Sequence, residues 1–345
     1  MRRLYEPRHI PASHRLSAWL LSALFALSLC VQQAWAAPAE RTVIPLGQAV
    51  GIKLFADGVL VVALADGPTP ARACGLRQGD IITAMDGAAV GSTEQVQDLL
   101  ADTAGAPIVL SVRRGADALA LTACARENNG VWQLGAWIRD SMAGIGTLTY
   151  YDPATGQYGA LGHGITDVDT AQLMPLASGA IMETTVKAVK KGAKGDPGEL
   201  KGDFSVQRDV GTVTVNSSGG IFGTVADPDF LSGGTPVPVA AAGQITTGPA
   251  TILATVSGSD VREYRVELVR LYGADEPTRN LLLRITDPAL LSATGGIVQG
   301  MVVSYNRDNS GEKPLRRKAL RACRIGAPVR CRRGQYGTTP FLQTG

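Results

Sequence analysis

Short apolar runs separated by glycine, proline and polar turns dominate most of the chain. Residues 43–64 hold two such runs, which favour β-strands because they are brief and rich in valine and leucine. A helix-periodic stretch follows Ser92 and Thr93, either of which is a suitable N-cap. Residues 107–125 then read as a strand pair. The pattern therefore predicts one folded unit over residues 43–125.

The pattern changes after this unit. Residues 126–140 predict a linker, with Trp132 and Trp137 as its apolar anchors. Over residues 141–301 strand-like runs alternate with turns, including a hairpin around 153–156. Such alternation is typical of a β-barrel or a pair of barrels. The sequence is therefore mainly β, with a second domain after the linker.

The N-terminal segment predicts export. Arginines precede an apolar run over residues 16–31, and the small-residue stretch AWAA follows it. A basic start, a short apolar run and small residues at its end predict a secretory signal over residues 1–37. An uncleaved membrane anchor is the alternative, because the run is only slightly short for a spanning helix. Either one exports the rest of the chain across the cytoplasmic membrane.

Composition adds a charge asymmetry. The 345-residue chain has a formal net charge of +3, but the ten Lys/Arg and two Asp/Glu of residues 302–345 leave the remainder mildly acidic. The basic residues form no face interleaved with aromatics, so no nucleic-acid partner is predicted. The cysteines outside the signal lack metal-binding spacing. Cys74 and Cys124 suit either a disulfide of an exported domain or two free thiols.

The candidate chemistry centres on one histidine. His163 is the only histidine after the predicted export segment, and Gly162 and Gly164 leave its ring open to a substrate. One histidine with Asp167 and Asp169 nearby is too few for a histidine-rich metal site, so no metal or cofactor is predicted. A histidine that acts with a carboxylate and a nucleophile fits better.

Asp287 is the candidate carboxylate partner of His163. It stands where a strand-like run stops, in the segment LRITDPALLSA. An aspartate before proline is also a common helix entry, so the local sequence suits a helix cap equally well.

The first folded unit resembles a PDZ domain. Residues 75–82, GLRQGDII, match the turn and strand that mark this family, and a DG hairpin turn follows. The resemblance implies that an extended peptide, either a C-terminus or an internal tail, adds as an edge strand at Val50, Gly51 and Ile52. The alternative is a domain that only packs on its neighbour.

Three motifs in order extend the resemblance: GALGHGITDVDT, VTVNSSGGIFG and LRITDPALLSATGGIVQGM. Together with the PDZ-like unit before them, they resemble the stage IV sporulation protein B peptidase family over about residues 40–301. The resemblance implies an exported serine endopeptidase with a chymotrypsin-like double β-barrel. The family's histidine falls on His163 and its aspartate on Asp287, while Gly300 and Met301 fall in its oxyanion region.

The family's serine follows the Gly-Met turn, and that position is Val302 in this chain. Valine has neither a proton to give His163 nor a lone pair to attack a carbonyl. Ser304, two residues on, is a weak substitute because a base must lie within about 3 Å of the attacking hydroxyl. Ser217 and Ser218 form another serine-glycine cluster, which is better explained as a hairpin turn.

The resemblance stops at Met301, and residues 302–345 form a basic tail unlike the family. A shifted reading frame explains such an abrupt change, and true divergence to an inactive homologue is the alternative. In both cases the second barrel is predicted to be incomplete at its C-terminal end, with open strand edges and a disordered tail.

By resemblance, the substrate is a membrane-linked regulatory protein in the intermembrane space of a forespore. Its cleavage triggers later sigma-factor activation, while the PDZ domain binds a peptide C-terminus or an internal tail. This copy is predicted to be inactive because of Val302. The second hypothesis, from another class, is a non-catalytic PDZ-containing interaction protein.

Overall fold

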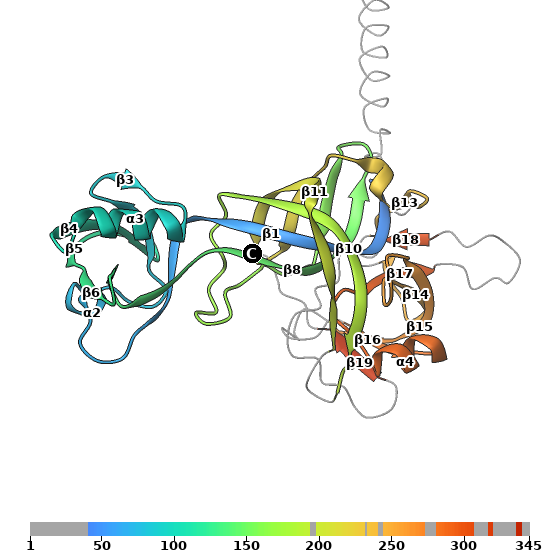
Figure 1. Ribbon diagram of the computed structural model, residues 1–345. Coiled ribbons are helices and arrows are strands. Elements are labelled where there is room, and N and C mark those ends of the chain that lie inside the picture. Colours follow the sequence, from blue (N-terminus) through green and yellow to red (C-terminus); the bar gives the residue numbers. More distant parts are fainter. Residues whose placement is uncertain are drawn as a thin grey trace, which may run out of the picture. The chain divides into compact units, whose positions relative to one another are not determined.

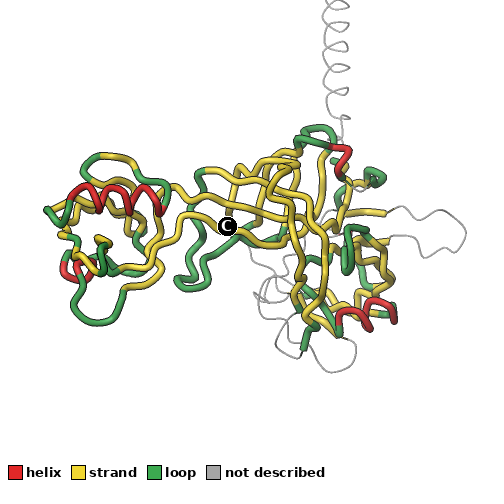
Figure 2. The backbone as a smooth tube through the Cα atoms, viewed as in Figure 1, coloured by secondary structure: helices red, strands yellow, loops and turns green. Residues whose placement is uncertain are grey.

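Antiparallel strands dominate the protein, and its helices are few and short (Figure 2). The computed structural model describes residues 41–193, 198–231, 233–240, 244–272, 281–306, 317–319 and 336–339. The mainly β fold predicted from the sequence is confirmed. The predicted signal or anchor over residues 1–37 lies outside the described residues. Within the described ranges, no helix has the length and apolar character needed to span a membrane.

Six strands close a first β-barrel. Each strand pairs with the next around a ring, and β1 completes it by pairing with β8 on one edge and β10 on the other. In ring order the strands are β1 (Thr42–Leu64), β8 (Ala136–Asp152), β9 (Gln157–Ala160), β12 (Gly220–Val225), β11 (Glu199–Ser217) and β10 (Ser178–Lys190). Their apolar residues are buried in one core, which includes Leu46, Ile52, Leu148 and Ile181.

The PDZ unit is inserted between β1 and β8 of this barrel (Figure 1). Its other elements are α2 (Pro70–Ala73), β2 (Ile81–Met85), β3 (Ala88–Ala89), α3 (Thr93–Thr103), β4 (Pro107–Arg114), β5 (Asp117–Cys124), β6 (Arg126–Asn128) and β7 (Val131–Gln133). Residues 43–56 belong to the barrel instead, because β1 pairs there with β8 and, over Gly51–Phe55, also with β10. The predicted boundaries, 43–125 for the PDZ domain and 126–140 for a linker, are corrected accordingly.

The second half of β1 is shared by two cores. Val59 and Val61 pack in the core of the PDZ unit, whereas Leu60 and Val62 join the core of the barrel. This division follows from strand geometry, since successive side chains point to opposite faces. The PDZ unit and the barrel are therefore joined by a strand that is buried on both sides.

Local sequence signals explain several elements of the PDZ unit. The Ser92 hydroxyl caps α3 by accepting from the backbone N–H of Gln95, and the Gln95 side chain accepts from the backbone N–H of Ser92. Asp86 and Gly87 have φ values of 47° and 81° in the two-residue turn between β2 and β3. Positive φ at both positions is what a tight hairpin turn of this kind requires.

Six strands form a second sheet, which corresponds to the predicted second barrel. In order across the sheet they are β18 (Arg317–Ala319), β17 (Val302–Asn306), β14 (Gly248–Ala254), β15 (Arg262–Leu271), β16 (Leu281–Ile285) and β19 (Tyr336–Thr339). Helix α4 (Pro288–Thr294) contributes Leu290 to the core of this sheet. Among the described residues no pairing joins β18 to β19, so the sheet is open at these two strands.

Three strands of this sheet come from the segment predicted to be a disordered tail. β17 pairs antiparallel with β14, and Val302, Val303 and Ser304 are buried. The prediction that the ordered domain ends at Met301 is therefore wrong for residues 302–306, which form β17. Apart from β17, β18 and β19, the tail lies outside the described residues.

The first barrel and the second sheet meet along β1 and β14. Thr255, directly after β14, donates its backbone N–H to the carbonyl of Gly47 (3.1 Å), and its Oγ1 accepts from the N–H of Ala49 (3.2 Å). Gly47 has a φ of +83°, and a Cβ there would lie 2.5 Å from the backbone of Leu253. Both the φ value and the close approach require glycine. The remaining elements are the 3-10 helix η1 (Pro228–Phe230) and β13 (Val237–Pro238).

Candidate active site

His163 lies in a tight turn that follows β9. The two residues before it, Leu161 and Gly162, have φ values of 64° and 76°, so the chain reverses sharply before the imidazole. The Nδ1 atom lies 2.9 Å from the carbonyl oxygen of Gly164. Because a carbonyl only accepts, we assign a hydrogen to Nδ1, so that in the corresponding tautomer of the imidazole Nε2 is the acceptor. This is the tautomer that a general base acting through Nε2 needs.

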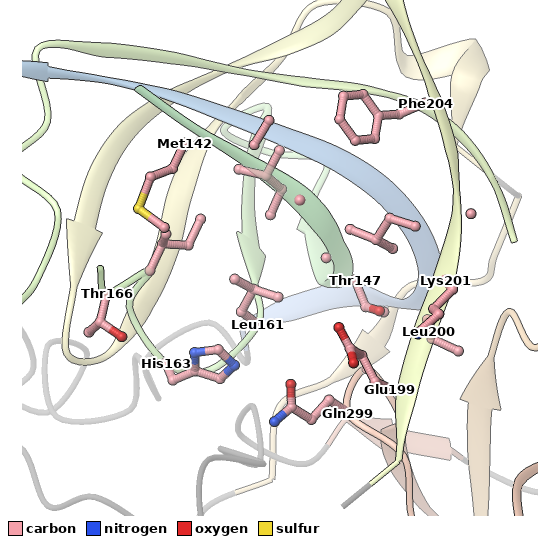
Figure 3. A pocket seen from close by; sticks show the side chains of 18 of the residues that line it. Met142, Thr147, Leu161, His163, Thr166, Glu199, Leu200, Lys201, Phe204 and Gln299 are labelled. Atoms are coloured by element: carbon pink, nitrogen blue, oxygen red, sulfur yellow. The ribbon is translucent and has the colours of Figure 1, made fainter. Parts of the chain in front are cut away.

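The histidine turn opens onto a pocket of about 580 Å³. One wall is β8 over Met142–Thr147, another is the start of β11, and Gln299 and Gly300 belong to the loop before β17. In Figure 3 the imidazole of His163 points across the pocket toward the side chains of Gln299 and Glu199. The structure thus brings His163 to the same pocket as Gly300 of the predicted oxyanion region.

Gly300 is shaped for this position. Its φ is +95°, and a Cβ there would lie 2.3 Å from Oγ1 of Thr147. A side chain at this position would therefore be strained by its backbone conformation and would clash with β8. The next residue, Met301, is buried in the core of the second sheet. Gly300 lines the pocket, whereas the Met301 side chain serves packing.

Asp287 does not line the pocket. It caps α4, because its Oδ1 accepts from the N–H groups of Ala289 (3.0 Å) and Leu290 (3.5 Å), and its Oδ2 accepts from a backbone N–H of β15 (3.5 Å). In the described structure no hydrogen bond or ion pair joins Asp287 to His163. The helix-cap interpretation is confirmed. The Nδ1 atom of His163 is bonded to the carbonyl of Gly164 instead.

The predicted nucleophile position, Val302, is part of a buried strand. Val302 is 9% exposed and pairs with Leu253 of β14. Ser304 is 1% exposed, and its hydroxyl has no hydrogen-bond partner among the described residues. Neither side chain lines the pocket of His163. Ser304 is more deeply buried than Val302 and lies two residues farther from the pocket-lining Gly300, so the structure does not support Ser304 as a substitute.

Ser217 is the last residue of β11, and Ser218 and Gly219 form the turn to β12, as the hairpin interpretation predicts. The Ser217 hydroxyl donates to the carbonyl of Gly220 (3.2 Å) and accepts from the N–H of Gly219 (3.2 Å). Both of its hydrogen-bonding functions therefore serve the turn. Cys74 and Cys124, weighed as a disulfide, are both free thiols.

Two side chains hold the histidine loop, although no local sequence signal marks either of them. The Asn216 side chain accepts from the N–H of Ile165 (2.9 Å) and donates to two backbone carbonyls of the loop. Arg139 of β8 pairs with both Asp167 and Asp169. Asp167 and Asp169, the candidate cation ligands, thus face a guanidinium. Sequence reasoning missed Asn216 and Arg139 because their partners lie far away in the chain.

Asp140, the next residue of β8, ties this strand to the PDZ helix. Its Oδ2 accepts from the backbone N–H (2.7 Å) and the hydroxyl (3.1 Å) of Thr93, the first residue of α3. Burial raises the pKa of Asp140, but the hydrogen bonds from Thr93 and the Ser141 hydroxyl together lower it below its usual value of 3.8. The carboxylate is therefore stabilised in its charged form.

The predicted peptide-binding residues of the PDZ domain are misplaced. Gly51 and Ile52 pair with β8 on one edge of β1 and with β10 on the other, Val50 pairs with β8, and Val50 and Ile52 are fully buried. A strand paired on both edges cannot accept a further strand. β8 offers an open edge instead. Over Ala136–Arg139 it pairs with β1 alone among the described residues, and Trp137 is 67% exposed.

A closed six-stranded barrel, a second six-stranded sheet and a histidine-lined pocket are features of serine peptidases built on two β-barrels, here combined with a PDZ unit. A family model described as SpoIVB peptidase S55 matches residues 130–306, just over half of the chain, and a PDZ domain model matches residues 62–114. The chain therefore belongs to the SpoIVB peptidase S55 family. The match runs past Met301 to Asn306. A search of curated proteins found no match.

Proposed function

We propose that this protein is a serine endopeptidase of the SpoIVB type whose present sequence lacks the nucleophile and is therefore inactive. The observation that carries the proposal is the pocket shared by His163 and Gly300, combined with valine at position 302. In an active chain, Nε2 of His163 takes the proton of the nucleophile, and the backbone near Gly300 stabilises the oxyanion. Without a hydroxyl no acyl-enzyme bond forms, and the loss of rate is on the order of 10⁶-fold.

The lining of the pocket supports a peptide substrate with an apolar side chain. Leu161, Leu200 and Phe204 line the pocket together with His163. Figure 3 shows Leu161 next to the histidine, while Leu200 and Phe204 belong to the β11 wall. A pocket that is largely apolar with a few polar groups is the usual form of a substrate site.

The cellular setting of the proposal comes from family membership. We infer that the chain is exported, either with a cleaved signal or with a membrane anchor. Its substrate is a membrane-linked regulatory protein in the intermembrane space of the forespore, and cleavage leads to sigma-factor activation. Protease protection of the protein in fractionated sporulating cells tests this location, and a purely cytoplasmic protein contradicts it.

The nucleophile experiment uses the full chain and a fluorescent serine-reactive phosphonate probe. The chains compared are the unmodified protein, Val302→Ser with Val303→Gly, and that double variant with His163→Gln added. We expect labelling of the double variant alone, since a serine hydroxyl needs the histidine to lose its proton. Labelling of the unmodified chain contradicts the assigned inactivity, and no labelling of a folded double variant contradicts the assigned site.

A non-catalytic PDZ-containing interaction protein is the second candidate. The open edge of β8 at Ala136–Arg139 favours it, as does Asp287 bonded to α4 rather than to His163. Fluorescence polarisation with peptides that have free or amidated C-termini tests it. This candidate is favoured if a peptide binds and Trp137→Ala weakens the binding, while the Val302→Ser, Val303→Gly variant is never labelled by the phosphonate probe. Absence of binding to any peptide removes its support.

A further inference from the structure

We propose that the PDZ unit positions His163 through an acidic turn, residues 167–172, which begins four residues after the histidine. Arg139 on β8 and Gln78 in the signature turn of the PDZ unit hold the acidic turn. The role of His163 as a base rests on the proposed function. The coupling between the PDZ unit and the histidine does not depend on it.

Asp167 organises the acidic turn from inside. Its side chain is fully buried, and Oδ1 accepts from the N–H of Asp169 (3.0 Å) and from both the N–H (2.9 Å) and the hydroxyl (3.1 Å) of Thr170. The backbone of Asp167 also accepts from the N–H of Ala171 (2.9 Å) and donates to the carbonyl of Gln172 (2.9 Å). One carboxylate therefore sets the shape of the whole turn.

Arg139 supplies the opposite charge that this burial requires. Its Nη1 pairs with Oδ2 of Asp167, and its Nη2 lies 3.0 Å from Oδ2 of Asp169. A buried carboxylate without a counter-charge is strongly unfavourable, so loss of the guanidinium favours an opened turn. Arg139 pairs with Leu60 of β1, which on its other edge pairs with Ile81 of the PDZ strand β2. The Arg139–Asp167 ion pair is thus anchored on β8, which belongs to the same sheet as the PDZ strand β2.

The PDZ signature turn contacts the acidic turn directly. Nε2 of Gln78 donates to the backbone carbonyl of Asp169 (2.9 Å). Gly79 lies against Gln172, because a Cβ at Gly79 would lie 2.3 Å from the Gln172 side chain. The signature turn is itself anchored, since the buried Asp80 accepts from its own turn and pairs with an arginine of β4 at 2.7 Å. Displacement of the PDZ unit therefore displaces the acidic turn.

The acidic turn is in turn connected to His163. Thr166 and Leu173 form a bridge across its base. Asn216 of β11 bonds to the N–H and the carbonyl of Ile165, which is two residues after the histidine. The loop is thus held by the barrel on one side and by the PDZ unit on the other. A change in the contacts from the PDZ unit therefore shifts the loop and reorients the imidazole of His163 in its pocket.

β8 extends this connection to the open edge of the PDZ unit. The strand lines the histidine pocket from Met142, three residues after Arg139. The last residue of its open edge, Ala136–Arg139, is Arg139, which forms the ion pair with Asp167. Arg139 and Asp167 are positioning residues for the histidine.

The test reads His163 directly by NMR in the full chain. The sequence has three histidines, and His163→Gln identifies which imidazole signals belong to this one. The test variants are Arg139→Gln, Arg139→Lys and Gln78→Ala. Arg113→Gln is the matched control, because it also removes an arginine–aspartate pair of the PDZ unit, at 3.2 Å to Asp57, in which both side chains are exposed.

We expect Arg139→Gln to shift the imidazole ¹⁵N and ¹H signals of His163 and to speed amide exchange over residues 163–174 by about tenfold or more. Arg139→Lys restores part of the shift because it keeps the charge but not the forked geometry. Gln78→Ala moves the same signals by a smaller amount. Unchanged signals in folded Arg139→Gln or in Gln78→Ala, or an equal response in Arg113→Gln, overturn the proposal. If Arg139→Gln does not fold, Gln78→Ala decides the outcome.

The result is separable from the nucleophile experiment. If the His163 signals respond to Gln78→Ala but the Val302→Ser, Val303→Gly variant is never labelled, the coupling stands and the peptidase assignment fails. If the Val302→Ser, Val303→Gly variant is labelled but the His163 signals do not respond to Gln78→Ala, the peptidase assignment stands and the coupling fails.

Discussion

The two sides of the His163 pocket differ in how completely they are built. On the barrel side, Asn216 and Asp167 hold the histidine loop with side-chain hydrogen bonds to its backbone. In β17, just beyond the pocket-lining Gly300, Val302 is apolar and the buried hydroxyl of Ser304 has no partner among the described residues. The order of the histidine loop does not depend on residue 302, because the hydrogen bonds of the loop lie within the barrel and the acidic turn rather than across the pocket.

The largest effect is expected on the histidine side, from Asp167→Ala. This change removes three accepted hydrogen bonds and leaves Arg139 without its buried partner, so we expect a loss of ~3 kcal/mol in the free energy of unfolding. Urea unfolding of the full chain measures it. Asp169→Ala is the control, because Asp169 is the exposed partner of the same arginine and is expected to cost less than ~1 kcal/mol. Equal losses in the two variants contradict the ordering role of Asp167.

Gly300→Ala tests the contact between the two sides. We expect a loss of ~2 kcal/mol, because the φ of +95° disfavours a side chain and the new Cβ meets Oγ1 of Thr147. Gly144→Ala is the control within the same pocket. No atom lies within 4 Å of a Cβ at Gly144, and its φ is not in the left-handed range, so we expect a change below ~0.5 kcal/mol. Thermal unfolding distinguishes the two, and a neutral Gly300→Ala means that the loop does not pack on β8 as described.

Ser304→Ala tests the incomplete side. Its hydroxyl is buried without a hydrogen-bond partner among the described residues, so removal relieves an unmet desolvation cost. We expect a gain of ~1 kcal/mol in the free energy of unfolding. The same change at Ser217, whose hydroxyl makes two hydrogen bonds, is expected to destabilise the chain. A destabilising Ser304→Ala shows that the Ser304 hydroxyl makes a polar contact after all.

The smallest effect concerns Asp140, which ties β8 to α3 beside the histidine side. The fold lowers the pKa of this carboxyl below 3.8, so folding favours its charged form. Its contribution to stability is therefore present above about pH 3.8 and is lost as the pH falls through the lower folded-state pKa. We expect the difference in Tm between the unmodified chain and Asp140→Asn to shrink from pH 6 to about pH 3. A difference that grows on acidification contradicts the assigned direction.

Local features of the fold were predictable from the sequence. Ser92 as a cap, the Asp86-Gly87 turn and the Ser217 turn depend on a few neighbouring residues, whose preferences the sequence displays directly. The partners of β1 were not predictable in this way. Gly51–Phe55 pairs with β10, far along the chain, and this pairing assigns the segment to the barrel rather than to the PDZ unit. A strand pattern shows that a strand forms, but not what it pairs with.

The residues of the candidate site also differ in whether the local sequence could predict their roles. His163 was identifiable because flanking glycines set it apart, and the structure brings it to one pocket with Gly300. Asp287 suited two roles in the sequence, and the packing of α4 selected the helix cap. Arg139 carries no local signal, since its function exists only where β8 passes the acidic turn.

The sequence by itself determined the family and the mainly β composition, and it displayed the single histidine after the predicted export segment and the valine at the position predicted for the nucleophile. Only the tertiary structure decided that β1 is shared by the barrel and the PDZ unit, that the open PDZ edge lies on β8, and that Asp167 faces Arg139. The physical reason is that these features depend on register and pairing between segments distant in the chain, which no local pattern of side chains encodes.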